Sequence, residues 1–125
     1  MGKMKLKKGW GTKQITEDIV QVCTPYVRPD GDHITFYMND MWLTDERHFW
    51  FEVQSRFAHG VLVEKKIKPV LEKYGVEFDP AGKEIYYSME NVTGNITKKM
   101  KAIYSFGEAL NELYRIKFES EGEDG

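Results

Sequence analysis

The clearest alternation of apolar and polar side chains runs from His33 to Met38. Every second side chain there is apolar, which predicts a half-buried β-strand. Asn39 and Asp40 both tolerate a positive φ, so they predict a two-residue hairpin loop that places Tyr37 opposite Trp42 on a second strand. The face of this hairpin that we expect in the core consists of Ile34, Phe36, Met38, Met41 and Leu43.

The spacing of apolar residues predicts a helix on each side of this hairpin. Apolar residues recur at i, i+4, i+7 and i+8 within residues 12–23, and Pro25 disfavours a longer helix, so this segment predicts a first helix. A second helix is expected after the hairpin, with Thr44 or Asp45 as its cap. The same stretch also fits a third strand, with one face formed by Phe49, Phe51 and Val53.

The second half of the chain repeats the alternation of helices and hairpins. A helix is predicted from Lys66 to Gly75, with Pro69 in its first turn. A hairpin follows over residues 76–78 and 84–89, and the longest helix runs from Ile96 to about residue 117 after capping residues at 91–95. The predicted order is α-β-β-α-α-β-β-α, which indicates an α+β domain with antiparallel hairpins packed against helices.

Length and composition are typical of one globular domain, because 125 residues match the commonest domain size. Residues 1–13 contain five lysines and no acid, so we expect a flexible basic arm at 1–11, on which Trp10 is able to dock against the domain. The domain itself is expected at 12–117 and an acidic tail at 118–125.

Charge and cysteine content narrow the expected surroundings. The formal net charge is −2, which makes nucleic acid an unlikely partner for the chain as a whole. One cysteine, Cys23, cannot form an internal disulfide and suits a reducing compartment, so we expect a cytoplasmic protein. No apolar run reaches the length of a membrane span, so no membrane partner is expected.

The densest group of aromatic and charged residues lies in and just after the first hairpin. Aromatic rings and arginine are the side chains that dominate the energy of protein interfaces. The residues predicted to form a binding surface are Tyr37, Trp42, Asp45, Arg47 and Trp50. Burial of these aromatics in the core, and a capping role for Asp45, remain the structural alternatives.

Two other functions stay open. Glu64-Lys65-Lys66 after an apolar stretch resembles the E-x-K element of Mg²⁺-dependent nucleases, with Asp45 or Asp40 as the upstream acid, although the pattern is short and a charged helix start is the simpler explanation. The catalytic set would then be Asp45, Glu64 and Lys66. Alternatively, the aromatics bind a small ligand or nucleotide by stacking. A concave pocket beside Trp42 would favour the small ligand, whereas a flat patch would favour a protein partner.

Four short stretches resemble one known family. They are Thr24-Pro25-Tyr26, residues 32–37 (DHITFY), residues 43–46 (LTDE) and residues 73–76 (KYGV), and together they are similar to the pattern of the bacterial and prophage domain of unknown function 1828 over about residues 14–115. Glu46-Arg47 stands where that pattern has Asp-Gly. The family has no assigned activity, so the resemblance implies a phage or mobile-element context. We therefore expect an accessory, anti-defence type of protein that needs no cofactor and occludes a host protein.

Overall fold

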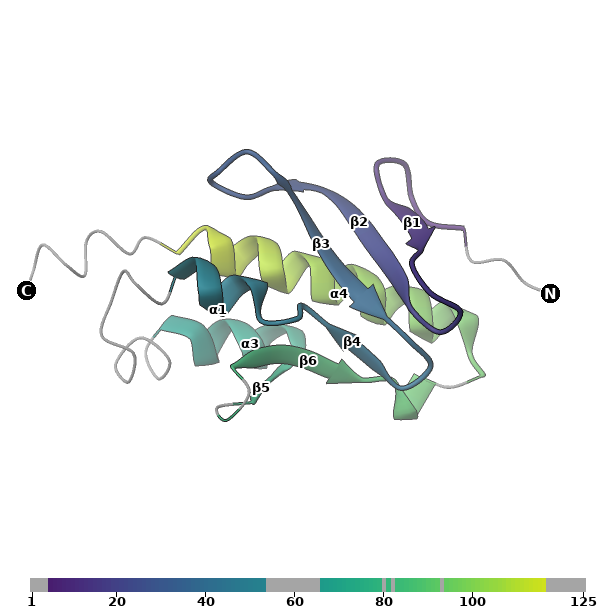
Figure 1. Cartoon of the computed structure of the whole chain (residues 1–125). Coiled ribbons are helices and arrows are strands. Elements are labelled where there is room, and N and C mark those ends of the chain that lie inside the picture. The colour runs from purple at the N-terminus through teal and green to yellow at the C-terminus, as the bar shows by residue number, and fades with distance from the viewer. Residues whose placement is uncertain (1–4, 54–65, 80, 82, 93, 117–125) are drawn as a thin grey trace, which may run out of the picture.

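The computed structural model describes residues 5–53, 66–79, 81, 83–92 and 94–116. A six-stranded antiparallel sheet with strand order β1-β2-β3-β4-β6-β5 forms one layer (Figure 1). Its strands are β1 (Gly11–Gln14), β2 (Val20–Val27), β3 (His33–Met38), β4 (Trp42–Thr44), β5 (Glu77–Asp79) and β6 (Glu84–Ser88). The predicted α+β class is confirmed.

The helices form the second layer of the domain. They are α1 (His48–Val53), α3 (Lys68–Tyr74), the 3-10 turn η2 (Glu90–Val92) and α4 (Ile96–Tyr114). The long helix α4 crosses behind the sheet, where it packs on β2 and β3 and also contacts α1 and α3 (Figure 1). The core lies between these layers, because the inward side chains of the strands meet α4 there, as in the packing of Phe36 on Phe106.

The helix predicted over residues 12–23 is wrong, because this segment forms most of β1, a turn and the first half of β2. Thr16 Oγ1 accepts hydrogen bonds from the backbone N–H groups of Asp18 and Ile19, and this turn reverses the chain. The apolar residues that suggested a helix are divided by it: Ile15 is exposed, whereas Val22 is buried on β2. Val20, Val22 and Thr24 also fit the period of a strand, and β-branched residues favour that choice.

The first hairpin is present, but its register differs from the predicted one. Tyr37 pairs with Thr44 rather than Trp42, and Met38 pairs with Leu43 rather than Met41. Asn39 Oδ1 accepts hydrogen bonds from the backbone N–H groups of Met41 and Trp42, which closes a longer turn than the two-residue loop predicted. A shift of two residues leaves every side chain on its predicted face. Met41 is the exception, since it lies in the turn and is exposed.

The other elements follow the sequence signals. Residues 48–53 are helical rather than a third strand, and the continuation of this segment to Gly60 lies outside the described residues. Pro69 occupies the first turn of α3, and Gly75 ends that helix in a left-handed conformation with φ 71°. The second hairpin is β5 and β6, and Asn95 caps α4 by accepting a hydrogen bond from the backbone N–H of Lys98.

The segment before β1 packs onto the domain through Trp10. Its ring stands edge to face against Tyr26 and Tyr104, with centroids 5.7 and 4.8 Å away. Gly107 of α4 lies directly beneath: a Cβ at that position would come 2.5 Å from Trp10 Cη2. The expectation that Trp10 docks on the domain is therefore confirmed. The acidic tail predicted at 118–125 lies outside the described residues.

Candidate binding site on the open sheet face

The strands present two faces, and within the described residues helices pack on only one of them. Inward residues such as Val22, Phe36 and Leu43 are fully buried beneath the helices. The alternate residues point to the opposite side, which we call the open face. One row across it runs over all six strands of the sheet and consists of Lys13, Gln21, Tyr37, Thr44, Tyr86 and Glu77.

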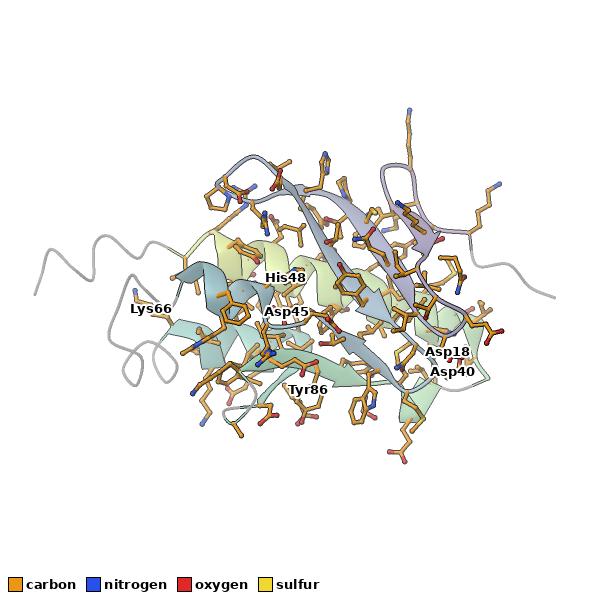
Figure 2. The ribbon with its side chains drawn as sticks, viewed as in Figure 1. Asp18, Asp40, Asp45, His48, Lys66 and Tyr86 are labelled. Carbon is orange, nitrogen blue, oxygen red and sulfur yellow. The ribbon has the colours of Figure 1, made fainter. Side chains whose placement is uncertain are left out.

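Two aromatic rings stand together near the middle of the open face. Trp42 of β4 is 42% exposed, and its ring stands edge to face against Tyr86 of β6, with centroids 5.5 Å apart. Figure 2 shows Tyr86 on β6, in the lower part of the sheet. The turn at Asn39 fixes where Trp42 enters its strand, because Asn39 accepts the Trp42 N–H. A half-exposed indole held in this way is available to a binding partner.

A surface hollow of about 480 Å³ lies beside this aromatic pair. It is lined by Asn39, Trp42, Thr44, Asp79, Glu84 and Tyr86. Thr44 donates its hydroxyl hydrogen bond to Glu84 Oε2, and Asp79 Oδ1 accepts the backbone N–H of Ala81. The hollow is therefore walled by aromatic rings on one side and by two carboxylates on the other.

A polar network occupies the neighbouring half of the open face. Gln21 Nε2 donates to the hydroxyl of Tyr37, and the thiol of Cys23 donates to Gln21 Oε1. The ring of Tyr37 stands edge to face against His48 at the start of α1, with centroids 6.1 Å apart. Tyr37 is therefore held on both sides, and it extends the aromatic surface from the hollow toward α1.

The predicted surface residue Asp45 is buried, with 2% of its area exposed, and it has a structural role. Its Oδ1 accepts the backbone N–H groups of Arg47 and Ile85 at 2.9 and 3.1 Å, and its Oδ2 accepts that of Phe49 at 3.1 Å. It therefore caps α1, as the sequence suggested, and also joins the end of β4 to β6. Burial raises the pKa of Asp45 to about 6, although the N–H groups of Ile85, Phe49 and Arg47 oppose the rise.

The other predicted surface residues divide into two groups. Tyr37 and Trp42 lie on the open face as expected, and Arg47 is exposed at the entry to α1, where its guanidinium lies 5.6 Å from the ring centroid of Phe51. Trp50 is buried, with 5% of its area exposed, and packs against Phe78. Asp45 and Trp50 are thus corrected from surface to interior, because Asp45 points inward at the end of β4 and Trp50 lies on the buried side of α1.

The alternative catalytic set is not assembled by the described residues. The Asp45 carboxylate accepts hydrogen bonds from backbone N–H groups, and Figure 2 shows Lys66, which precedes α3, well apart from it. Glu64 lies outside the described residues. Asp40 lies near the opposite end of the sheet from Asp45 (Figure 2). Among the residues that the structure describes, no group of three or more His, Cys, Asp or Glu side chains is placed to hold a metal ion.

Sequence reasoning missed Tyr86, Glu84 and Asp79. The alternation over residues 84–88 places Glu84, Tyr86 and Ser88 on one face of their strand, and this signal was present. What the sequence lacked was the pairing of β4 with β6, which brings Trp42 opposite Ser88 and Thr44 opposite Tyr86. Those two strands are separated by about forty residues of chain, so no local pattern predicts that they are neighbours.

In comparisons with known proteins, no family model, no curated protein and no solved structure matches the chain. None of the described helices is long and apolar enough to cross a bilayer.

Proposed function

We propose that this chain is a binding module that uses its open sheet face to dock and occlude a partner protein. The observation that carries the proposal is the half-exposed Trp42, held against Tyr86 on a face that no described helix covers. Tryptophan and tyrosine are the side chains that most often dominate binding energy when a partner desolvates them. The partner class that we favour is a protein of the cell that hosts a phage or mobile element.

The charge of the open face supports a protein partner over nucleic acid. Glu77, Asp79 and Glu84 lie together on β5 and β6, beside the aromatic pair. In the described part of the chain none of these three carboxylates forms an ion pair. Phosphate groups would be repelled from such a surface, whereas a partner with basic side chains would be attracted.

A small ligand is the second candidate, and the hollow beside Trp42 is the observation that favours it. Its volume of about 480 Å³ lies within the range of small-molecule sites. The nuclease alternative receives less support, because all the hydrogen bonds of the buried Asp45 carboxylate go to backbone N–H groups of its own fold. A metal ligand at this position would have to give up these bonds.

The proposal is tested by capture followed by measurement of the purified pair. Immobilised wild-type protein retains partners from lysates of the cells in which the gene occurs, and mass spectrometry identifies them. Calorimetry then compares the purified partner with wild type and with Trp42→Ala, for which we expect affinity to fall at least about tenfold. Folding of each variant is checked by circular dichroism and thermal unfolding.

Ile96→Ala is the matched control, because Ile96 is also about half exposed but lies at the start of α4, away from the open face. It should bind with wild-type affinity. A partner that binds Trp42→Ala as tightly as wild type would contradict the proposal. Binding of a small molecule, with no retained protein, would favour the second candidate instead.

A further inference from the structure

We infer that the hollow beside Trp42 receives the guanidinium group of an arginine side chain on the partner protein. The inference rests on the proposed protein-binding function and names the chemistry that the open face recognises.

The two carboxylates of the hollow come from adjacent strands at directly opposed positions. Asp79 of β5 and Glu84 of β6 are paired across the hairpin, so their side chains leave the sheet next to each other on the open face. Both line the hollow. A guanidinium presents several N–H donors in one plane, so it is able to bind two carboxylates at once, whereas an ammonium is a compact point charge.

Each carboxylate has one oxygen already engaged and one available. Asp79 Oδ1 accepts the N–H of Ala81, and Glu84 Oε2 accepts the hydroxyl of Thr44. These bonds restrict both side chains, and the second oxygen of each has no hydrogen-bond partner among the described residues. The site therefore offers two positioned acceptors to an incoming donor, which lowers the entropy cost of binding.

The nearby basic residue is directed elsewhere. Lys83 lies in the turn that joins β5 to β6, directly before Glu84, yet its ammonium lies 5.1 Å from the ring centroid of Trp50. Within the described ranges, the ion pairs of the chain involve other acids, as in the pairs of Arg28 with Asp30 and Asp32. The negative charge of the hollow is thus left for a cation from outside.

Aromatic rings complete the site for a cation. Trp42 and Tyr86 stand at an interplanar angle of 74°, so two differently oriented ring surfaces border the hollow. A guanidinium is weakly hydrated and stacks readily on an indole, where the cation–π attraction adds to the charged hydrogen bonds. The electrostatic potential at this site also favours a cation. Burial, and then the negative charge of Glu77, raise the pKa of the Tyr86 hydroxyl.

The test uses three small probes and the full chain. N-acetyl-arginine amide, N-acetyl-lysine amide and N-acetyl-citrulline amide are titrated while the indole N–H resonance of Trp42 is followed by NMR. Citrulline has nearly the shape of arginine without its charge. We expect the arginine probe to bind with a Kd on the order of 1–10 mM, several-fold tighter than the lysine probe, and the citrulline probe to cause no saturable shift.

The double variant Asp79→Asn/Glu84→Gln should weaken arginine binding at least about tenfold. Its matched control is Glu17→Gln/Asp18→Asn, which removes the same charge from the exposed turn between β1 and β2 and should leave the titration unchanged. Equal binding of arginine and citrulline, equal binding of arginine and lysine, or an arginine titration that the double variant leaves intact would each overturn the inference.

Failure of this inference is distinguishable from failure of the proposed function. A partner protein whose affinity depends on Trp42, together with no response to the arginine probe, overturns the guanidinium site and leaves the docking face standing. A saturable response to the arginine probe that the double variant abolishes supports the inference directly.

Discussion

The two faces of one sheet differ although they are built from alternate residues of the same strands. On β3, Phe36 points into the core with no exposed area, and its neighbour Tyr37 points to the open face. The covered face is mostly apolar, with Thr24 and Asp45 as buried polar exceptions, because helices remove it from water. The open face combines aromatic rings with carboxylates and amides. The covered face therefore stabilises the fold. The side chains of the open face contribute less to stability, so their composition is able to suit a binding partner.

Replacing the two neighbours on β3 separates the faces most strongly. Phe36→Ala removes a fully buried ring that packs on Phe106, so we expect the free energy of unfolding to fall by about 3–5 kcal/mol. Tyr37→Ala loses one side-chain hydrogen bond and a partly exposed ring, and should cost about 1 kcal/mol. Urea unfolding of both variants measures the difference, and equal losses would contradict the division between the faces.

Asp45 is the ionisable exception on the covered side, and its burial should make the free energy of unfolding depend on pH. Its pKa rises from 3.8 in the unfolded chain to about 6 in the fold, so the folded protein binds more protons between these values. The free energy of unfolding should therefore fall as pH rises from about 4 to about 7, by about 3 kcal/mol from this group. Urea unfolding of wild type relative to Asp45→Asn isolates this change. A stability difference that grows with pH would show that the three N–H bonds outweigh burial.

Gly107 tests how closely the covered side is packed. Gly107→Ala favours the helix by about 1 kcal/mol but drives a Cβ into Trp10, so we expect a net loss of about 1–2 kcal/mol of unfolding free energy. In a Trp10→Ala background the same substitution should stabilise the protein, because the obstructing ring is gone. Thermal unfolding of the four proteins of this cycle measures the coupling, and additive effects would contradict the contact.

The smallest effect is expected at the boundary of the two faces. Glu46 and Arg47 have φ values of 57° and 68°, in the left-handed region that favours glycine. Arg47→Gly should raise the unfolding free energy by about 0.5–1 kcal/mol, with Lys73→Gly in α3 as a destabilising comparison. A loss of stability in Arg47→Gly would show that the arginine side chain compensates for its backbone.

Sequence patterns predicted those elements whose signals are local. Pro69, Gly75 and Asn95 mark the ends of α3 and the start of α4 through the backbone geometry and hydrogen bonds that these residue types favour. Residues 12–23 misled because a spacing of four residues also arises when two strands flank a turn. The turn chemistry of Thr16 was the competing signal.

The sequence predicted only the part of the candidate site that comes from the first hairpin. Trp42 and Tyr37 follow from the alternation of the first hairpin, and they lie on the open face. Trp50 was misplaced because a tryptophan just after a hairpin looks the same in sequence whether its helix turns outward or inward. Tyr86 and Glu84 depend on strand pairing between distant segments, which is a property of the fold as a whole.

The docking of Trp10 beside Gly107 has a consequence for how the protein is made. Lys7 leaves the ribosome well before its partner on α4, since the hydrogen bond between Lys7 and Tyr104 spans 97 positions of the chain. The contacts of the N-terminal segment with β2 are able to form early, but its contacts with α4 can form only after α4 has been synthesised. Its contact with α4 closes a long loop of chain, so we expect this contact to form late in folding and the fluorescence of Trp10 to change when it does.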